Sequence, residues 1–139
     1  MFSTSPELMA VQFNNLNMYM KHATLGGKLL AFIRMVVSEI EDCKYCVGMN
    51  SSILMQYGVL PEVSAEVKLD PSKAPLDEKE KAMLLFVVKV VKEANAVEAA
   101  DVENLRGLGW DDKEILEASY HATSQVGADK LFNAFKINM

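Results

Sequence analysis

The chain has 139 residues, half of them hydrophobic and 24% charged, so we expect a single folded domain over residues 1–139. The formal net charge of −5 disfavours nucleic acid as a partner, because phosphate backbones attract clustered Lys and Arg. The densest apolar run, residues 83–88, is far too short to span a bilayer, and no basic segment followed by an apolar stretch begins the chain. We therefore expect no membrane partner either.

Apolar residues in the first part of the chain recur with helical spacing. Ser5 followed by Pro6 is typical of a helix start, and Gly26-Gly27 interrupts the pattern. Asp42 is expected to cap the third helix, because a short polar side chain can accept a hydrogen bond from the first-turn N–H groups. The helices predicted in this half span residues 6–21, 28–40 and 43–57.

The second part of the chain carries two capping signatures. Asp77 stands three residues before Glu80, and Asp111 three residues before Glu114. Three prolines mark residues 59–76 as a connector, with room for a short helix. No strand pattern is evident, so the predicted fold class is all-α, a compact bundle of about six or seven helices. The helices predicted in this half span residues 62–67, 77–93, 98–105 and 111–135.

Nine methionines is a high count for this length. A flexible thioether fills irregular gaps between packed side chains, so methionine at helical spacing is most often part of a core. We expect this role for the methionines of the first three helices, Met18, Met20, Met35, Met49 and Met55.

The two cysteines stand three residues apart, in Cys43-Lys44-Tyr45-Cys46. On a helix this spacing puts the two Cβ atoms about 5–6 Å apart, which suits a reversible disulfide. The first turn of a helix also favours a thiolate, so we expect a lowered thiol pKa and redox chemistry. One closely spaced pair without an export signal favours a reducing cytoplasmic location.

Two other interpretations of the cysteines are open. A structural zinc site needs four ligands, and the remaining soft candidates, His22 and His121, lack ligand spacing. We therefore expect no metal and no cofactor. Buried cysteines that serve only as small hydrophobic side chains are the second alternative.

The stretch from Arg34 to Asn50 resembles the alkylhydroperoxidase D-like branch of the carboxymuconolactone decarboxylase family. Ser38, five residues before the first cysteine, and the C-x-Y-C core are typical of that branch. Weaker similarity continues in the later half, and the resemblance covers roughly residues 25–135. It implies a compact all-helical subunit that forms a homo-oligomer, a trimer or hexamer. The segments with the weaker similarity are residues 76–81, 102–109 and 111–116.

The activity that the resemblance implies is that of a thiol peroxidase or a disulfide reductase. The substrate would be a hydroperoxide or a disulfide, and a thiol reductant would recycle the protein. Carried over by position, Cys46 would be the nucleophile and Cys43 the resolving thiol. The true decarboxylases of the family generally lack this pair, which argues against decarboxylation.

Two residues depart from the pattern of the active branch. It has a Glu twelve residues before the first cysteine and a His four residues after the second, where this chain has Ala31 and Asn50. Neither can act as a base, and general-base assistance is typically worth about 10²–10⁴ in rate. We expect weak peroxidase activity and favour disulfide exchange. The alternative is a catalytically impaired binding or assembly protein with structural cysteines.

Other residues could complete the site. His121 could replace the missing base, because a histidine ordinarily titrates near neutral pH. Glu39 stands four residues before Cys43 and could supply a carboxylate near the thiols. A structural histidine and a solvated glutamate are the simpler interpretations of the two. Tyr45 and Asn50 are predicted to line the substrate site, although Tyr45 also suits a packed aromatic role.

Overall fold

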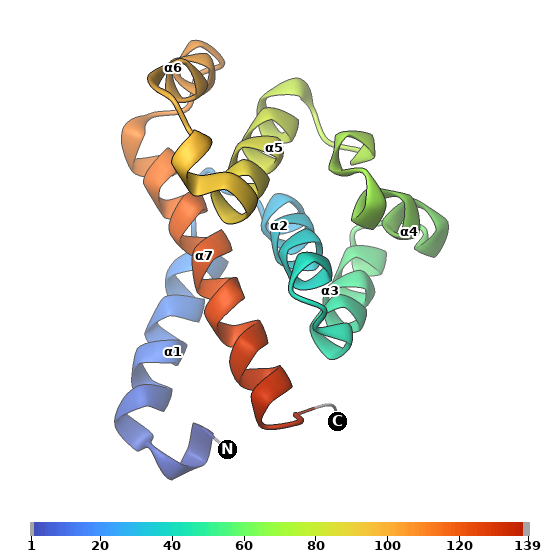
Figure 1. The fold of residues 1–139 in the computed structure, drawn as a ribbon, viewed down its shortest axis with the longest axis vertical. Helices are drawn as coiled ribbons and strands as arrows, with labels where there is room; N and C mark the ends of the chain where they lie inside the picture. The colour runs from blue at the N-terminus through green and yellow to red at the C-terminus, as the bar shows by residue number, and fades with distance from the viewer. Residues whose placement is uncertain (1, 138–139) are drawn as a thin grey trace.

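The computed structural model describes residues 2–137 and shows seven α-helices and three short 3-10 helices in that range, without a strand (Figure 1). The all-α prediction is therefore confirmed. None of these helices is both long and apolar enough to cross a membrane. In chain order the elements are η1 (Phe2–Thr4), α1 (Pro6–Met20), α2 (Gly27–Ile40), α3 (Lys44–Gln56), α4 (Pro61–Leu69), η2 (Pro71–Lys73), α5 (Glu78–Glu93), η3 (Ala94–Ala96), α6 (Ala99–Gly107) and α7 (Asp112–Ala134).

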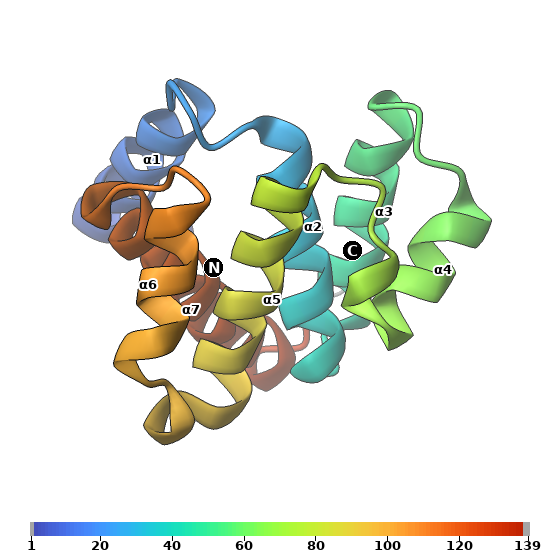
Figure 2. The ribbon, with the colours of Figure 1, turned by 90° about the horizontal axis from the view of Figure 1, so that it is seen from above.

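Helix α2 is the centre of the bundle, because every residue from Leu29 to Ser38 except Arg34 is buried. It packs against α3, α5 and α7, and Figure 2 shows α5 on one side of it and α3 on the other. Ser38 is the polar member of its buried stretch and lies one turn before the cysteines. The buried residues of α2 are Leu29, Leu30, Ala31, Phe32, Ile33, Met35, Val36, Val37 and Ser38.

The predicted caps of α5 and α7 are present. Asp77 Oδ1 accepts a hydrogen bond from the Glu80 N–H at 2.7 Å. Asp111 and Glu114 form a reciprocal capping box, in which each side chain accepts from the other's N–H, at 2.7 and 2.9 Å. Local sequence therefore determines where these two helices begin.

The turn between α2 and α3 differs from the prediction. Asp42 has a φ of 54°, in the left-handed region that Asp adopts more readily than most residues, whereas an N-cap needs extended backbone. Cys43 is the N-cap instead, and its N–H donates to the Ser38 carbonyl at 2.9 Å. Helix α3 therefore begins at Lys44, which places Cys43 immediately before the first turn and Cys46 within it.

Most of the methionines that were predicted to fill the core are exposed. Met35 is buried in α2, but Met18, Met20, Met49 and Met55 lie at the surface, so the prediction is wrong for these four. Two of them belong to α1, a helix that is exposed over most of its length. We call the exposed apolar side chains of this helix the α1 apolar surface: Leu8, Val11, Phe13, Leu16, Met18 and Met20.

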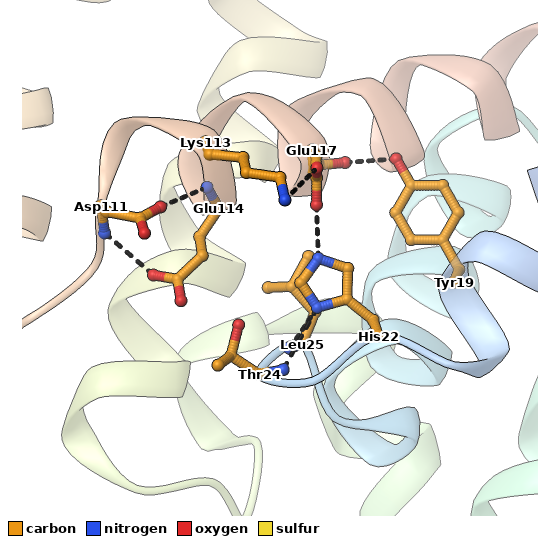
Figure 3. Close-up of polar contacts among 8 residues, drawn as sticks. All are labelled: Tyr19, His22, Thr24, Leu25, Asp111, Lys113, Glu114 and Glu117. Atoms are coloured by element: carbon orange, nitrogen blue, oxygen red, sulfur yellow. Dashed lines mark hydrogen bonds and ion pairs between the residues drawn. The ribbon is translucent and has the colours of Figure 1, made fainter.

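His22 attaches the end of α1 to α7 (Figure 3). Its Nδ1 accepts hydrogen bonds from the N–H groups of Leu25 and Thr24 at 3.0 and 3.2 Å, so its proton is on Nε2. That nitrogen lies 2.5 Å from Glu117 Oε2. The Tyr19 hydroxyl donates to the Glu117 carbonyl at 2.6 Å, which makes a second link between the same two helices.

Candidate active site

The two cysteines lie close together at the start of α3. Both are free thiols with 1% of their surface exposed. Their Sγ atoms lie within 4.8 Å of each other. Rotation of the side chains would therefore bring the sulfurs to bonding distance without a large movement of the backbone.

A buried carboxyl group completes a cluster with the two thiols. Asp129 projects from α7, is 0% exposed, and has a carboxylate oxygen within 4.8 Å of both sulfurs. Its Oδ1 accepts hydrogen bonds from Ser38 Oγ at 3.0 Å and from Gln125 Nε2 at 2.7 Å. Its Oδ2 has no hydrogen-bond partner among the described residues. Asp129 therefore presents an unpartnered, buried carboxylate oxygen, Oδ2, beside the cysteines.

Asp129 and Gln125 were missed in the sequence, although a signal for them exists. His121, Gln125 and Asp129 recur every four residues, which places three polar side chains along one face of α7. The neighbouring Ala118 and Ala122 are fully buried, so this face points inward. Polar residues on an inward-facing stripe are candidates for a site, because burial is costly unless they have partners.

The electrostatics of the site favour protonated side chains. Burial raises the pKa of Cys46, and the neighbouring Cys43 and Asp129 raise it further. The expected lowering of the thiol pKa at the helix start is therefore wrong for Cys46, because burial and a nearby carboxyl outweigh the helix dipole. Burial also raises the pKa of Asp129, although the neighbouring Gln125, the two thiols and Ser38 oppose this.

Asn50, at the position where the resemblance implies a His, supports the first turn of α3. It is fully buried, and its Nδ2 donates to the Cys46 carbonyl at 2.9 Å. Its Oδ1 accepts from Arg34 Nε at 2.8 Å, which connects α3 to α2. Ala31 is buried in the same helix as Arg34. Asn50 therefore contacts the backbone carbonyl of Cys46.

His121 and Glu39 are not members of the thiol cluster. His121 Nε2 lies 3.2 Å from Arg34 Nη1, and its ring packs at 4.3 Å from that of Tyr19. Burial, and secondly the charge of Arg34, lower the pKa of His121 to about 3, so it is neutral at physiological pH. Glu39 is half-buried near the end of α2. A role for either as the base stays a prediction.

A surface hollow of about 480 Å³ opens beside Cys43. We call it the Cys43 hollow. The Tyr45 ring stacks on that of Phe132 at its edge, with 5.7 Å between ring centroids. Lys44 and Lys136 supply positive charge, and Cys46 does not belong to the lining. The lining residues are Asp42, Cys43, Lys44, Tyr45, Phe132, Asn133, Lys136 and Ile137.

The cluster also has the composition of a partial metal site. Cys43, Cys46 and Asp129 offer two sulfurs and one oxygen, all within 4.8 Å of one another. A closed structural zinc site uses four protein ligands, and these are three. The same groups also suit proton and electron transfer, for which a close dithiol and a carboxyl are sufficient.

No protein-family model and no curated protein matches the chain. Several solved structures resemble it in fold, among them the following three. One is an uncharacterized peroxidase-related protein from Silicibacter sp. TM1040, with a TM-score of 0.81 and 24% identity over 91% of this chain. The chain spans 66% of that protein, just under two thirds of its length.

The other two structures extend the comparison. One is an alkylhydroperoxidase AhpD core, an uncharacterized peroxidase-related protein from Ralstonia eutropha JMP134, with a TM-score of 0.81 and 27% identity over 96% of this chain and 70% of that one. The other is a protein of unknown function from Agrobacterium tumefaciens, provisionally assigned to AhpD antioxidant defence, with a TM-score of 0.80 and 20% identity over 97% and 92%. The alkylhydroperoxidase D-like resemblance is confirmed by these structures.

Proposed function

We propose that this alkylhydroperoxidase D-like chain is a dithiol oxidoreductase, in which Cys43 and Cys46 form a disulfide as they reduce a substrate. The observation that carries the proposal is the cluster itself. Two free thiols lie within 4.8 Å of each other and of a buried carboxyl group. Purely structural cysteines would not need a carboxyl beside them, since such a group is costly to bury.

The substrate we propose is an organic hydroperoxide or a small disulfide. The dithiol supplies two electrons and two protons, which convert ROOH to ROH and water, or RSSR to two RSH. An external thiol then reduces the protein disulfide. The aromatic pair Tyr45 and Phe132 and the charges of Lys44 and Lys136 suit a substrate with an apolar body and an anionic group.

The Cys43 hollow suggests which thiol meets the substrate. Cys43 lines it and Cys46 does not. Because its pKa is raised, the Cys46 thiol is also less ionised in the resting protein than the thiol of an ordinary cysteine. We therefore assign the attack on the substrate to Cys43 and the closure of the disulfide to Cys46, which is the reverse of the order implied by the family resemblance.

The experiment that tests the function follows the thiols of the fully reduced protein. One equivalent of cumene hydroperoxide or of 2-hydroxyethyl disulfide is added at neutral pH, and thiol loss is timed. Mass spectrometry then locates the Cys43–Cys46 disulfide. We expect a rate above that of free cysteine for at least one substrate. A rate no faster than free cysteine for both would overturn the proposal in favour of structural cysteines.

We also propose that the chain forms homo-oligomers through the α1 apolar surface. Its six side chains are between 42% and 73% exposed, although all six are hydrophobic. Six exposed apolar side chains on one helix are typical of a surface that another protein covers. A second copy of the chain is the occupant that the family resemblance implies, in a trimer or hexamer.

A further inference from the structure

The proposed chemistry needs a group that accepts the thiol protons, and neither Ala31 nor Asn50 can do so. We propose that the carboxylate of Asp129 is this base and that it serves Cys43 and Cys46 in turn. The assignment rests on the proposed function, because it names the proton acceptor of the same dithiol reaction.

The position of Asp129 allows it to serve both sulfurs. A carboxylate oxygen lies within 4.8 Å of each Sγ, so a small rotation brings either thiol within hydrogen-bonding distance. Oδ1 is held by Ser38 and Gln125. Oδ2 is buried and has no hydrogen-bond partner among the described residues, so its lone pairs are available for a proton.

The other acidic side chains near this turn lie outside the cluster. Glu39 is half-buried near the end of α2, and Glu41 forms an ion pair with Lys130, with Oε2 to Nζ at 2.9 Å. His121 faces Arg34. In the part of the chain that the structure describes, no Glu or His joins the cluster of the two cysteines and Asp129. Asp129 is therefore the base that is in place.

The surroundings of Asp129 also suit this role chemically. The groups that act on its carboxyl are Gln125, Ser38 and the two thiols, with burial as the largest influence on its pKa. An aspartate with a raised pKa binds a proton more readily than an exposed one does, so it is the stronger base toward a thiol.

The first step oxidises Cys43. Asp129 takes the proton of the Cys43 thiol while the sulfur attacks an oxygen of ROOH. The O–O bond breaks, and the leaving alkoxide takes the proton from Asp129 as ROH. Cys43 is now a sulfenic acid, which has lost two electrons, and Asp129 is again ionised.

The second step closes the disulfide. Asp129 takes the proton of the Cys46 thiol, and the Cys46 sulfur attacks the Cys43 sulfur. The S–O bond breaks, and hydroxide leaves with the proton as water. With RSSR as substrate the same two proton transfers occur, and the leaving groups are two RS⁻ that depart as RSH.

The test is Asp129→Asn, which keeps the size of the side chain and removes the base. Thiolate absorbance in the ultraviolet is titrated, and the oxidation rate with cumene hydroperoxide and with 2-hydroxyethyl disulfide is measured at neutral pH. We expect the thiol titration to move to lower pH, because the nearby carboxylate no longer opposes a thiolate. We expect oxidation to slow by about 10²-fold or more.

Thiols that ionise more readily and yet are oxidised more slowly would distinguish Asp129 as a base from Asp129 as a merely electrostatic neighbour. A variant whose thiols ionise more readily and react equally fast or faster would overturn the assignment of Asp129 and leave the dithiol function intact. A wild-type protein that reacts with neither substrate would overturn the proposed function itself. Asp112→Asn is the matched control, because it removes an exposed carboxyl from the same helix, and both readouts should stay unchanged.

A second variant covers the case in which Asp129→Asn does not fold. Ser38→Ala removes one hydrogen-bond donor from Oδ1 and leaves the carboxyl in place. The donor favours the ionised form, so its loss should raise the pKa of Asp129 further. The pH profile of oxidation, measured over about pH 5 to 9, should then move to higher pH. An unmoved profile would overturn the assignment.

Discussion

Ser38 and Asp129 share a hydrogen bond of 3.0 Å although they stand 91 residues apart in the sequence. Ser38 lies near the end of α2 and Asp129 near the end of α7, so the bond connects the two helices at the turn that carries the cysteines. Burial is the largest influence on the pKa of Asp129 and raises it. The fold therefore keeps a carboxyl that is costly to bury at the place where the proposed dithiol chemistry would need a base.

The stability of the protein should depend on the ionisation of Asp129. Burial raises its pKa above the ordinary value of 3.8, so the folded state binds this proton more tightly than the unfolded chain does. The resulting stabilisation is fully present below the ordinary pKa and is lost as the pH rises through the raised one. The free energy of unfolding of Asp129→Asn, measured relative to that of wild type, should therefore increase as the pH rises from low to neutral.

Urea denaturation of both proteins over that pH range measures this difference. Asp112→Asn provides a control of opposite sign, because hydrogen bonding to Arg106 lowers the pKa of Asp112. The stabilisation that ionised Asp112 gives the wild-type protein is lost as the pH falls through the lowered pKa. A difference between Asp129→Asn and wild type that stays constant with pH would contradict a raised pKa for Asp129.

Single cysteine variants should reveal the order of the thiols. Cys46→Ser keeps the sulfur that lines the Cys43 hollow, so it should react once with cumene hydroperoxide and stop at a sulfenic acid. Cys43→Ser should lose most of the reaction, because its remaining sulfur is outside that lining. A sulfenic-acid probe with detection by mass spectrometry measures both. Trapping on Cys46 in the Cys43→Ser variant, at the wild-type rate, would restore the order implied by the resemblance.

Local sequence was sufficient for much of the fold and for half of the site. The spacing of Asp111 and Glu114 predicted a capping box because both partners lie within one turn. The three-residue spacing of the cysteines predicted two adjacent sulfurs for the same reason. Asp42 was misassigned because its left-handed backbone is set by the sharp turn between two packed helices, which residue type alone does not determine.

The rest of the site depends on contacts between distant segments. Asp129 meets Ser38 and the cysteines only after α7 packs against α2, and its sequence neighbours give no sign of thiols nearby. The pKa of Cys46 follows from the same packing, because burial outweighs the helix dipole. The exposure of Met18 and Met20 likewise follows from the position of α1 at the margin of the bundle (Figure 1).

His22 should control how firmly α1 is attached. His22→Ala removes the contact with Glu117 and leaves the N–H groups of Thr24 and Leu25 without their acceptor. We expect the free energy of unfolding to fall by about 1–3 kcal/mol. Hydrogen exchange should become faster in α1, while thiol oxidation stays unchanged. Protection of α1 equal to that of wild type would show that Tyr19 alone holds the helix.

The α1 apolar surface should determine the oligomeric state. Val11 and Phe13 are among its most exposed members, at 60% and 57%. Replacing both by Glu places two negative charges where a second copy would bury apolar area, so association should weaken while the fold of the subunit is kept. Light scattering after gel filtration should report a trimer or hexamer for wild type and a smaller species for the variant.

Asn14→Glu is the matched control, because Asn14 is exposed on the same helix and is not apolar. It adds one negative charge without removing hydrophobic area, so the mass of the oligomer should change less than in the double variant. A wild-type protein that is monomeric at all concentrations would contradict the oligomer. An oligomer that survives both glutamates would place its interface on another face, such as that of the exposed Leu116 and Tyr120 on α7.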